Sequence, residues 1–199
     1  MRILVVCTGN VCRSPIGELL LTRYLEGTSI EVSSAGTRGL SGHRIDPSSA
    51  RLLEAAGIDS VGFRSRRLTR PIAMSADLIL CFEKKQRRDI VSLAPTAVRH
   101  TFLVGEFAQM CEYCARRGMI SGLTIQERLM SVVRRSAMIR PMLDESPDIV
   151  DPIGKDFEVF QRAAEETNTA IRRILTSMRK HYASAIVDQS LRDGTVSAV

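Results

Sequence analysis

The eight residues from Cys7 to Ser14, Cys-Thr-Gly-Asn-Val-Cys-Arg-Ser, constrain this chain more strongly than any other stretch. They follow a continuous apolar run at residues 3–6, Ile-Leu-Val-Val, which is typical of a strand buried on both faces. They precede Pro15, which is favoured in the first turn of a helix, and apolar residues at helical spacing follow. The sequence therefore predicts a strand, a loop and a helix N-terminus. Such a loop turns its backbone N–H groups into one concavity, where the helix dipole adds partial positive charge, and we expect it to bind an oxyanion.

The residue types in this loop indicate phosphoryl chemistry. Cys7 stands at the base of the loop, where a thiol close to amides and a helix N-terminus is expected to ionise to the thiolate. Arg13 offers a planar guanidinium that can hold two phosphate oxygens, and Ser14 can donate a hydrogen bond to the sulfur. A thiolate nucleophile, an amide nest and a bidentate arginine suit attack on a phosphate monoester. The glycine-rich pattern of nucleotide-binding loops is absent, so nothing predicts ATP or GTP binding.

The motif Cys-x5-Arg-Ser after the first strand, within VVCTGNVCRSPIGE at residues 5–18, resembles the signature of the low-molecular-weight protein tyrosine phosphatases of bacterial type. The resemblance extends over residues 1–107 and 147–182. It implies a metal-independent hydrolase that forms a phosphocysteine on Cys7 and acts on phosphotyrosine proteins, a bacterial tyrosine kinase among the candidates. No cofactor is expected, because Arg13 and the amides supply the positive charge. The implied phosphate-binding residues are Thr8, Gly9, Asn10, Val11, Cys12, Arg13 and Ser14, with Asn10 bracing the loop.

A second constellation, at residues 148–154, supplies a candidate general acid. The leaving group needs a proton donor, and water must later be activated against the thiophosphate, and one carboxyl group can do both in turn. The resembled family places this acid in an Asp-Pro pair just before the final helix, and Asp151-Pro152 matches that pattern. Asp148 and Asp156 are local competitors, which we expect to be loop and helix-cap residues.

Three positions depart from the resembled family and bear on its preference for phosphotyrosine. Leu40, in the glycine-rich loop after the second strand, stands where an aromatic residue sets substrate preference. Phe63 stands where a histidine of the family buttresses the loop at residues 7–14, which we call the phosphate loop. Ile153 stands where an aromatic residue commonly follows the Asp-Pro pair.

The remaining pattern predicts one α/β domain over residues 1–182. Further strands at residues 30–35, 76–82 and 99–104 alternate with helices, which indicates a four-stranded parallel sheet in a doubly wound three-layer α/β/α sandwich, with the ligand at the carboxyl ends of the strands. A long final helix begins near Phe157. Residues 108–146 are expected to be a helical insertion of one or two helices that forms a lid or a partner surface, and residues 183–199 a mobile tail.

The five cysteines show no spacing of a disulfide framework, so we expect a reducing cytoplasm. Cys111-x-x-Cys114 could suggest zinc or redox chemistry. No second pair follows and the only later histidine is His181, so we expect cysteines on a helix face. Cys12 is a candidate redox partner of Cys7: a thiolate oxidised to sulfenic acid can be trapped by a nearby thiol as a disulfide, as the resemblance also implies.

The net charge of +6 and a pI near 9.4 favour anionic partners, phosphorylated ones included. The basic residues are not interleaved with aromatics, so nucleic acid is not expected as a partner. Arg64, Arg66 and Arg67 are expected to form a solvated face. No stretch has the length of a membrane span. Because a strand is predicted from residue 2, no signal peptide is expected. A monomer is expected.

Two other functions remain open from the sequence. An arsenate reductase uses a similar anion loop but needs a relay of further thiols. Cys81 lies on a predicted buried strand with no second cysteine a few residues on, which disfavours an internal relay. A phosphoprotein-binding module with weak catalysis is the third possibility, suggested by the departures at Leu40, Phe63 and Ile153.

Overall fold

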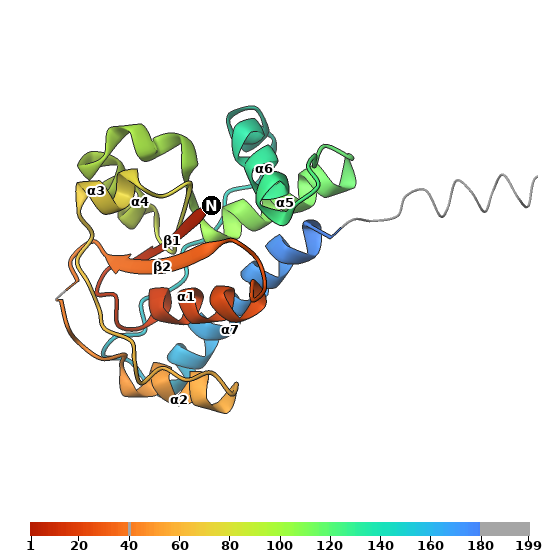
Figure 1. The fold of residues 1–199 in the computed structure, drawn as a ribbon. Helices are drawn as coiled ribbons and strands as arrows, with labels where there is room; N and C mark the ends of the chain where they lie inside the picture. Colours follow the sequence, from red (N-terminus) through yellow and green to blue (C-terminus); the bar gives the residue numbers. More distant parts are fainter. Residues whose placement is uncertain (40, 180–199) are drawn as a thin grey trace, which may run out of the picture.

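The computed structural model describes residues 1–39 and 41–179 of the chain. Its strands are β1 (Arg2–Cys7), β2 (Glu31–Gly36), β3 (Leu78–Cys81) and β4 (Thr101–Leu103), and they form one parallel sheet in the order β2-β1-β3-β4. The expected four-stranded parallel sheet is therefore confirmed. Figure 1 shows β1 and β2 side by side.

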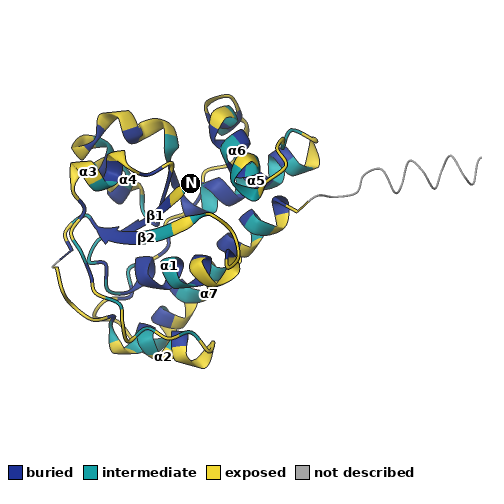
Figure 2. Ribbon diagram, viewed as in Figure 1, coloured by how far each residue is buried: buried dark blue, intermediate teal, exposed yellow. Residues whose placement is uncertain are grey.

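Helices cover both faces of the sheet because alternate strand residues face opposite cores. Ile3 and Val5 of β1 point to a large core, and Leu4 and Val6 to a smaller one. The smaller core is covered by α3 (Arg70–Met74), α4 (Lys84–Leu93) and the 3₁₀ turn η1 (Pro95–His100). The large core is covered by α1 (Arg13–Tyr24), α5 (Val104–Arg116) and α7 (Phe157–Ser177), with α2 (Pro47–Ala55), α6 (Ile125–Ile139) and the 3₁₀ turn η2 (Arg140–Met142) outside them. Figure 2 shows the buried sheet between helices whose outer faces are exposed.

The strand order places a natural ligand site at the end of β1. The chain leaves β1 toward β2 on one side and later adds β3 on the other, and open α/β sheets bind ligands at the carboxyl ends of the strands where the order reverses. Cys7 is the last residue of β1 and pairs with Gly36 at the end of β2. The carboxyl ends of β1 and β2 lie at the left of Figure 1, where the connecting loops gather.

Two strands are shorter than the sequence pattern predicted. The run at residues 76–82 contributes only Leu78–Cys81 to the sheet, and the run at 99–104 only Thr101–Leu103. Pro95 starts a 3₁₀ turn that continues to His100. Beyond the strand, α5 begins at once, because the Glu106 carboxylate accepts a hydrogen bond from the Leu103 N–H, 3.3 Å.

The segment 108–146 holds the rest of α5, all of α6 and η2. The apolar face of α6, which includes Leu129 and Val132, is fully buried in the large core. The Arg128 Nε donates to the Met178 carbonyl, 2.6 Å, and the Ser29 hydroxyl, just before β2, donates to Gln126, 3.2 Å. These contacts hold α6 near the amino end of β2, so it does not form a lid over the carboxyl ends of the strands. The other expectation for this segment, a partner surface, stays a prediction.

The predicted tail at residues 183–199, and residues 180–182 of the predicted domain, lie outside the described residues. Among the helices that the structure does describe, none combines the length and the apolar character needed to cross a membrane.

Candidate active site

The loop between β1 and α1 leaves a helix N-terminus open to an anion. Asn10 has a φ of 58°, in the left-handed region, and this turns the chain tightly between Cys7 and Cys12. No side chain caps α1 at Cys12, and the first turn of α1 contains no acidic residue. In the described part of the chain, the N–H groups of Gly9, Val11 and Cys12 donate to no protein acceptor. These amides and the helix dipole are therefore available to an oxyanion.

The Cys7 sulfur lies at the base of this loop, nearly fully buried. It accepts the Asn10 N–H at 3.2 Å and lies 2.9 Å from the Ser14 hydroxyl oxygen. That hydroxyl oxygen also accepts a hydrogen bond from the Asn10 side-chain amide, 2.9 Å. Ser14 therefore keeps its own hydrogen for the sulfur. Two hydrogen-bond donors therefore converge on the sulfur.

Asn10 is the centre of the network that holds the loop in shape. Its amide nitrogen donates to Ser14 and also to the Ser34 hydroxyl, 2.7 Å, and Ser34 in turn donates to Glu18, 2.5 Å. The side-chain oxygen Oδ1 of Asn10 accepts the Arg66 main-chain N–H, 2.8 Å. Glu18 is the last residue in this series of hydrogen bonds, and burial raises the pKa of its carboxyl group. The expectation that Asn10 braces the loop is thus met by four hydrogen bonds, counting its own N–H to Cys7.

The expectation of a solvated arginine face at residues 64–67 is wrong for Arg66. Arg64 and Arg67 are exposed, but Arg66 is half-buried and its Nε donates to the Ser34 carbonyl, 2.6 Å. Phe63 packs against the large core. The contact that supports Asn10 from this segment therefore comes from the Arg66 main chain.

Arg13 is buried, with 2% of its side chain exposed. Its Nη1 donates to Glu83, 2.5 Å, and to the Ile149 carbonyl, 2.7 Å, while Nη2 pairs with the Asp151 carboxylate at 2.8 Å. Among the described residues its Nε has no partner. One edge of the guanidinium is thus anchored by protein. The other edge, formed by Nε and Nη2, contacts only Asp151.

Asp151 lies in the loop before α7, as predicted, and the fold brings it to Arg13 across more than a hundred residues of sequence. The two competing carboxylates, Asp148 and Asp156, have other partners or positions. The Asp148 carboxylate accepts the Lys84 N–H, 2.9 Å, and Asp156 is the N-cap residue of α7. Ile153 is 49% exposed. Leu40, the other departure near the substrate side, lies outside the described residues.

Cys12 is buried beneath the loop, and burial raises its pKa to about 12. Both Cys7 and Cys12 are free thiols here, so a disulfide between them stays a prediction. Cys111 and Cys114 lie on the buried face of α5, and Cys81 is buried in β3 with its thiol donating to the Phe102 carbonyl. Burial raises the pKa of all three thiols.

Sequence reasoning missed Glu83 and Gln86, which follow β3 and hold the loop from the other side. The Gln86 side-chain oxygen Oε1 accepts the Phe82 N–H, 2.9 Å, and the Glu83 N–H, 3.2 Å. Its amide nitrogen donates to Glu83, 2.9 Å, and to the Thr8 hydroxyl, 3.2 Å. Gln86 therefore links the phosphate loop to the carboxylate that anchors Arg13. A polar residue three positions before a glutamine at a helix start is a capping pattern, and it was the available signal.

Glycine is required where β2 passes the phosphate loop. A Cβ at Gly36 would lie 2.7 Å from the Thr8 carbonyl oxygen and 2.9 Å from the Asn10 nitrogen. The Thr37 and Arg38 N–H groups donate to the carbonyls of Cys7 and Thr8, each at 2.9 Å. The backbone after β2 is therefore fastened directly to the loop.

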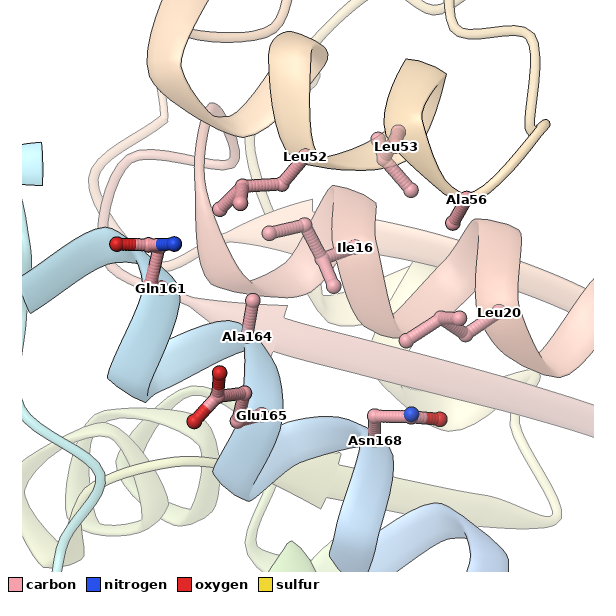
Figure 3. Close-up of a pocket in the computed structure, with 9 residues that line it drawn as sticks. All are labelled: Ile16, Leu20, Leu52, Leu53, Ala56, Gln161, Ala164, Glu165 and Asn168. Carbon is pink, nitrogen blue, oxygen red and sulfur yellow. The ribbon is translucent and has the colours of Figure 1, made fainter. Parts of the chain in front are cut away.

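A hollow of about 190 Å³ lies between α1, α2 and α7, away from this chemistry (Figure 3). Its lining is mostly aliphatic, from Ile16, Leu20, Leu52, Leu53, Ala56 and Ala164, with Gln161, Glu165 and Asn168 at the α7 side. It contains neither the nucleophile nor a cation, so it does not suit phosphoryl transfer.

Comparison with known proteins agrees with this geometry. The sequence model of the family described as low molecular weight phosphotyrosine protein phosphatase matches residues 2–115, which contain the whole phosphate loop. Asp151 and α7 lie beyond that match. The low molecular weight protein-tyrosine-phosphatase Etp of Escherichia coli K12 is 41% identical over 110 residues, 55% of this chain and 73% of Etp. The probable phosphatase EpsP of Ralstonia solanacearum is 42% identical over 107 residues, 54% of this chain and 72% of EpsP.

Solved structures extend the similarity to nearly the whole chain. The tyrosine phosphatase Wzb from Escherichia coli K30 in complex with sulphate is 31% identical, with a TM-score of 0.63 over 86% of this chain and 94% of Wzb. The YwlE arginine phosphatase from Geobacillus stearothermophilus is 27% identical, with a TM-score of 0.64 over 98% of both chains. The phosphate loop, the parallel sheet and these relatives lead to one assignment: the chain belongs to the low molecular weight phosphotyrosine protein phosphatase family.

Proposed function

We propose that this protein hydrolyses phosphotyrosine in proteins through a covalent phosphocysteine on Cys7. The observation that carries the proposal is the convergence on one sulfur of the Asn10 N–H and the Ser14 hydroxyl, at an uncapped helix N-terminus beside a buried Arg13. A thiolate held this way faces the position where the amides would hold a phosphate, as in-line attack requires.

In the first step, the Cys7 thiolate attacks phosphorus and the bond from phosphorus to the tyrosine oxygen breaks. The loop amides and Arg13 hold the equatorial oxygens, where charge is spread in the transition state. Asp151, protonated, gives its proton to the leaving phenolate oxygen. In the second step, water attacks the phosphocysteine, Asp151 takes its proton, and the sulfur leaves as thiolate with release of inorganic phosphate.

The two edges of the Arg13 guanidinium have different roles: one is anchored by protein groups and the other can bind phosphate. Nη1 is held by Glu83 and Ile149, so the guanidinium cannot rotate freely. Nε and Nη2 then form the edge that binds two phosphate oxygens, a planar fork suited to that geometry. Asp151 pairs with Nη2. When phosphate takes that edge, the carboxyl group is released toward the leaving-group oxygen.

A second candidate substrate class is phosphoarginine, because one similar structure is named an arginine phosphatase. Ile153 and Val150, exposed beside Asp151, are aliphatic and do not require a flat aromatic ring. Arsenate reduction is less well supported, because Cys81, Cys111 and Cys114 are all buried in the core and none can serve as an accessible relay thiol.

We further propose a monomer that acts in the cytoplasm on phosphotyrosines of proteins such as a bacterial tyrosine kinase. Five free thiols suit a reducing compartment. A net charge of +6 suits phosphorylated protein partners.

The test is phosphate release from a phosphotyrosine peptide and a phosphoarginine peptide, with arsenate reduction measured in parallel. The tyrosine peptide is expected to be turned over fastest. Cys7→Ser is expected to abolish turnover but keep phosphate binding, because the nest is backbone. Asp151→Asn is expected to slow turnover by about a hundredfold or more, the usual contribution of a positioned proton donor. Asp148→Asn is the matched control and should stay close to wild type; a larger loss there than in Asp151→Asn would assign the acid to Asp148.

A further inference from the structure

The mouth of the site is bounded by two walls of opposite charge. The first wall, residues 37–39, 41–45 and 60–70, contains six arginines. The two carboxylates that border it, Asp46 and Asp59, accept the N–H groups of Ser48 and Val61. The second wall, residues 143–156, contains five carboxylates and one lysine. We call them the basic wall and the acidic wall.

Sheet order puts these walls on opposite sides of Cys7. The basic wall follows β2: the Arg38 N–H donates to the Thr8 carbonyl, and the Gly36 N–H donates to the Arg66 carbonyl, 3.0 Å. The acidic wall is fastened after β3: the Ile149 N–H donates to the Phe82 carbonyl and the Lys84 N–H to Asp148, each at 2.9 Å. Because β1 lies between β2 and β3, the phosphate loop lies between the walls.

The arginines of the basic wall are available to a partner. Arg38, Arg44, Arg64 and Arg67 are exposed. Within the described residues, none of these four guanidinium groups lies within 4.0 Å of a carboxylate. By contrast, the Arg66 Nε donates to the Ser34 carbonyl and serves the loop, and the Arg64 Nη1 donates to the Val61 and Phe63 carbonyls, so the availability of the wall rests on Arg38, Arg44 and Arg67. On the acidic wall, Glu145 pairs with Lys84 of α4. Asp144 and Asp156 are exposed and have no cation partner among the described residues.

We propose that this basic wall selects phosphotyrosine segments with acidic residues on one side of the phosphotyrosine. The inference rests on the proposed function and names its substrate class. Acidic residues that flank the phosphotyrosine on the side of the basic wall meet unpaired guanidinium groups, while the flank on the other side meets carboxylates. Complementary charge raises association and selects partners, and like charge rejects them. Acidic residues should therefore raise kcat/KM only when they flank the phosphotyrosine on the side of the basic wall.

The experiment compares kcat/KM for phosphotyrosine peptides at low salt: a neutral peptide, two peptides with glutamates on one side only, and one with glutamates on both sides. One of the one-sided peptides should exceed the neutral peptide by about tenfold, mainly through KM, as expected for binding remote from the reacting bond. The doubly acidic peptide should gain no more than the better one-sided peptide. The preference should fade at high salt, because exposed charges are screened over about 10 Å at 0.1 M salt and less above it.

The variant Arg38→Gln/Arg44→Gln/Arg67→Gln should lose the preference and keep wild-type hydrolysis of p-nitrophenyl phosphate. A matched variant, Arg116→Gln/Arg162→Gln/Arg172→Gln, removes the same charge from exposed positions on α5 and α7 and should keep the preference. Equal turnover of acidic and neutral peptides by wild type would overturn the inference but not the proposed function, whereas no turnover of any phosphotyrosine peptide would overturn both. Binding to anionic vesicles that needs Arg38, Arg44 and Arg67, without any peptide preference, would assign the wall to a membrane surface and also overturn the inference.

Discussion

Asn10 shows how one residue sets both the shape and the chemistry of the loop. Its φ of 58° costs energy for most side chains, and its amide spans Ser14, Ser34 and the Arg66 main chain. We expect Asn10→Ala to lower kcat/KM by about a hundredfold or more, comparable to the loss of a positioned donor at an oxyanion. Asn10→Gly separates the two roles, because glycine accepts the backbone angle but makes no side-chain hydrogen bonds. Wild-type kcat/KM in Asn10→Gly would show that the network is not needed.

Cys12 is predicted to protect Cys7 from irreversible oxidation by forming a disulfide with it, and the burial of Cys12 sets how fast that disulfide forms. Peroxide oxidises the Cys7 thiolate to a sulfenic acid, and attack by the Cys12 sulfur expels hydroxide, taken up as water, to form the disulfide. Because burial raises the pKa of Cys12 to about 12, its thiolate fraction is small at pH 7. The rate of disulfide formation should therefore rise about tenfold per pH unit between pH 7 and 9.

Mass spectrometry after a peroxide pulse, followed by thiol reductant, measures this rate and the recovery of activity. Cys12→Ser should not recover, because its Cys7 proceeds to sulfinic acid. Equal recovery in both proteins would refute a resolving role for Cys12.

At the scale of elements, we expect α6 to contribute to stability and not to chemistry. Leu129 is fully buried, and α6 contacts α5, the 3₁₀ turns η1 and η2, and Met178 just after α7. Leu129→Ala should lower the free energy of unfolding by about 2–5 kcal/mol, the range for a buried leucine truncated to alanine. The kcat of the folded protein should be unchanged. Urea unfolding measures the loss, with Met138→Ala, 55% exposed on the same helix, as the control. A loss of kcat without a loss of stability would place α6 in the catalytic site.

The elements differ in how far the sequence could predict them. The loop between β1 and α1 is contiguous in sequence with Cys7 and Arg13, so local pattern and turn chemistry were sufficient to predict its position, while the roles of these two residues stay predictions. The order of strands and helices followed from alternating apolar periods. Arg66 and Glu83 could not be assigned, because their roles depend on which main-chain and guanidinium groups the fold brings within 3 Å. Of the two roles expected for α6, the lid was wrong for the same reason: an amphipathic pattern indicates that a face is buried but not against which element.

At the scale of the whole molecule, buried thiols predict a loss of stability at alkaline pH. Burial raises the pKa of Cys12, Cys81, Cys111 and Cys114 in the folded state above the unfolded value near 9. The unfolded chain therefore loses these protons first as pH rises, so the stabilising contribution is complete below about pH 9 and declines above it.

The free energy of unfolding in urea should fall steadily from pH 9 to pH 11. Cys81→Ala should be less stable than wild type at pH 7 but show a shallower fall. An unchanged slope would mean that Cys81 titrates alike in both states.

The central claim is that Cys7 carries the phosphoryl group between the two steps. The most direct measurement is ³¹P NMR and mass spectrometry of Asp151→Asn, mixed with p-nitrophenyl phosphate and quenched in detergent. The good leaving group lets the first step proceed without the acid, whereas hydrolysis still needs the base, so a phosphorylated enzyme should accumulate. The account predicts a thiophosphate resonance and one added phosphoryl group that maps to Cys7 and is absent from Cys7→Ser/Asp151→Asn. Turnover with no phosphorylated enzyme, or phosphate on another residue, would contradict it.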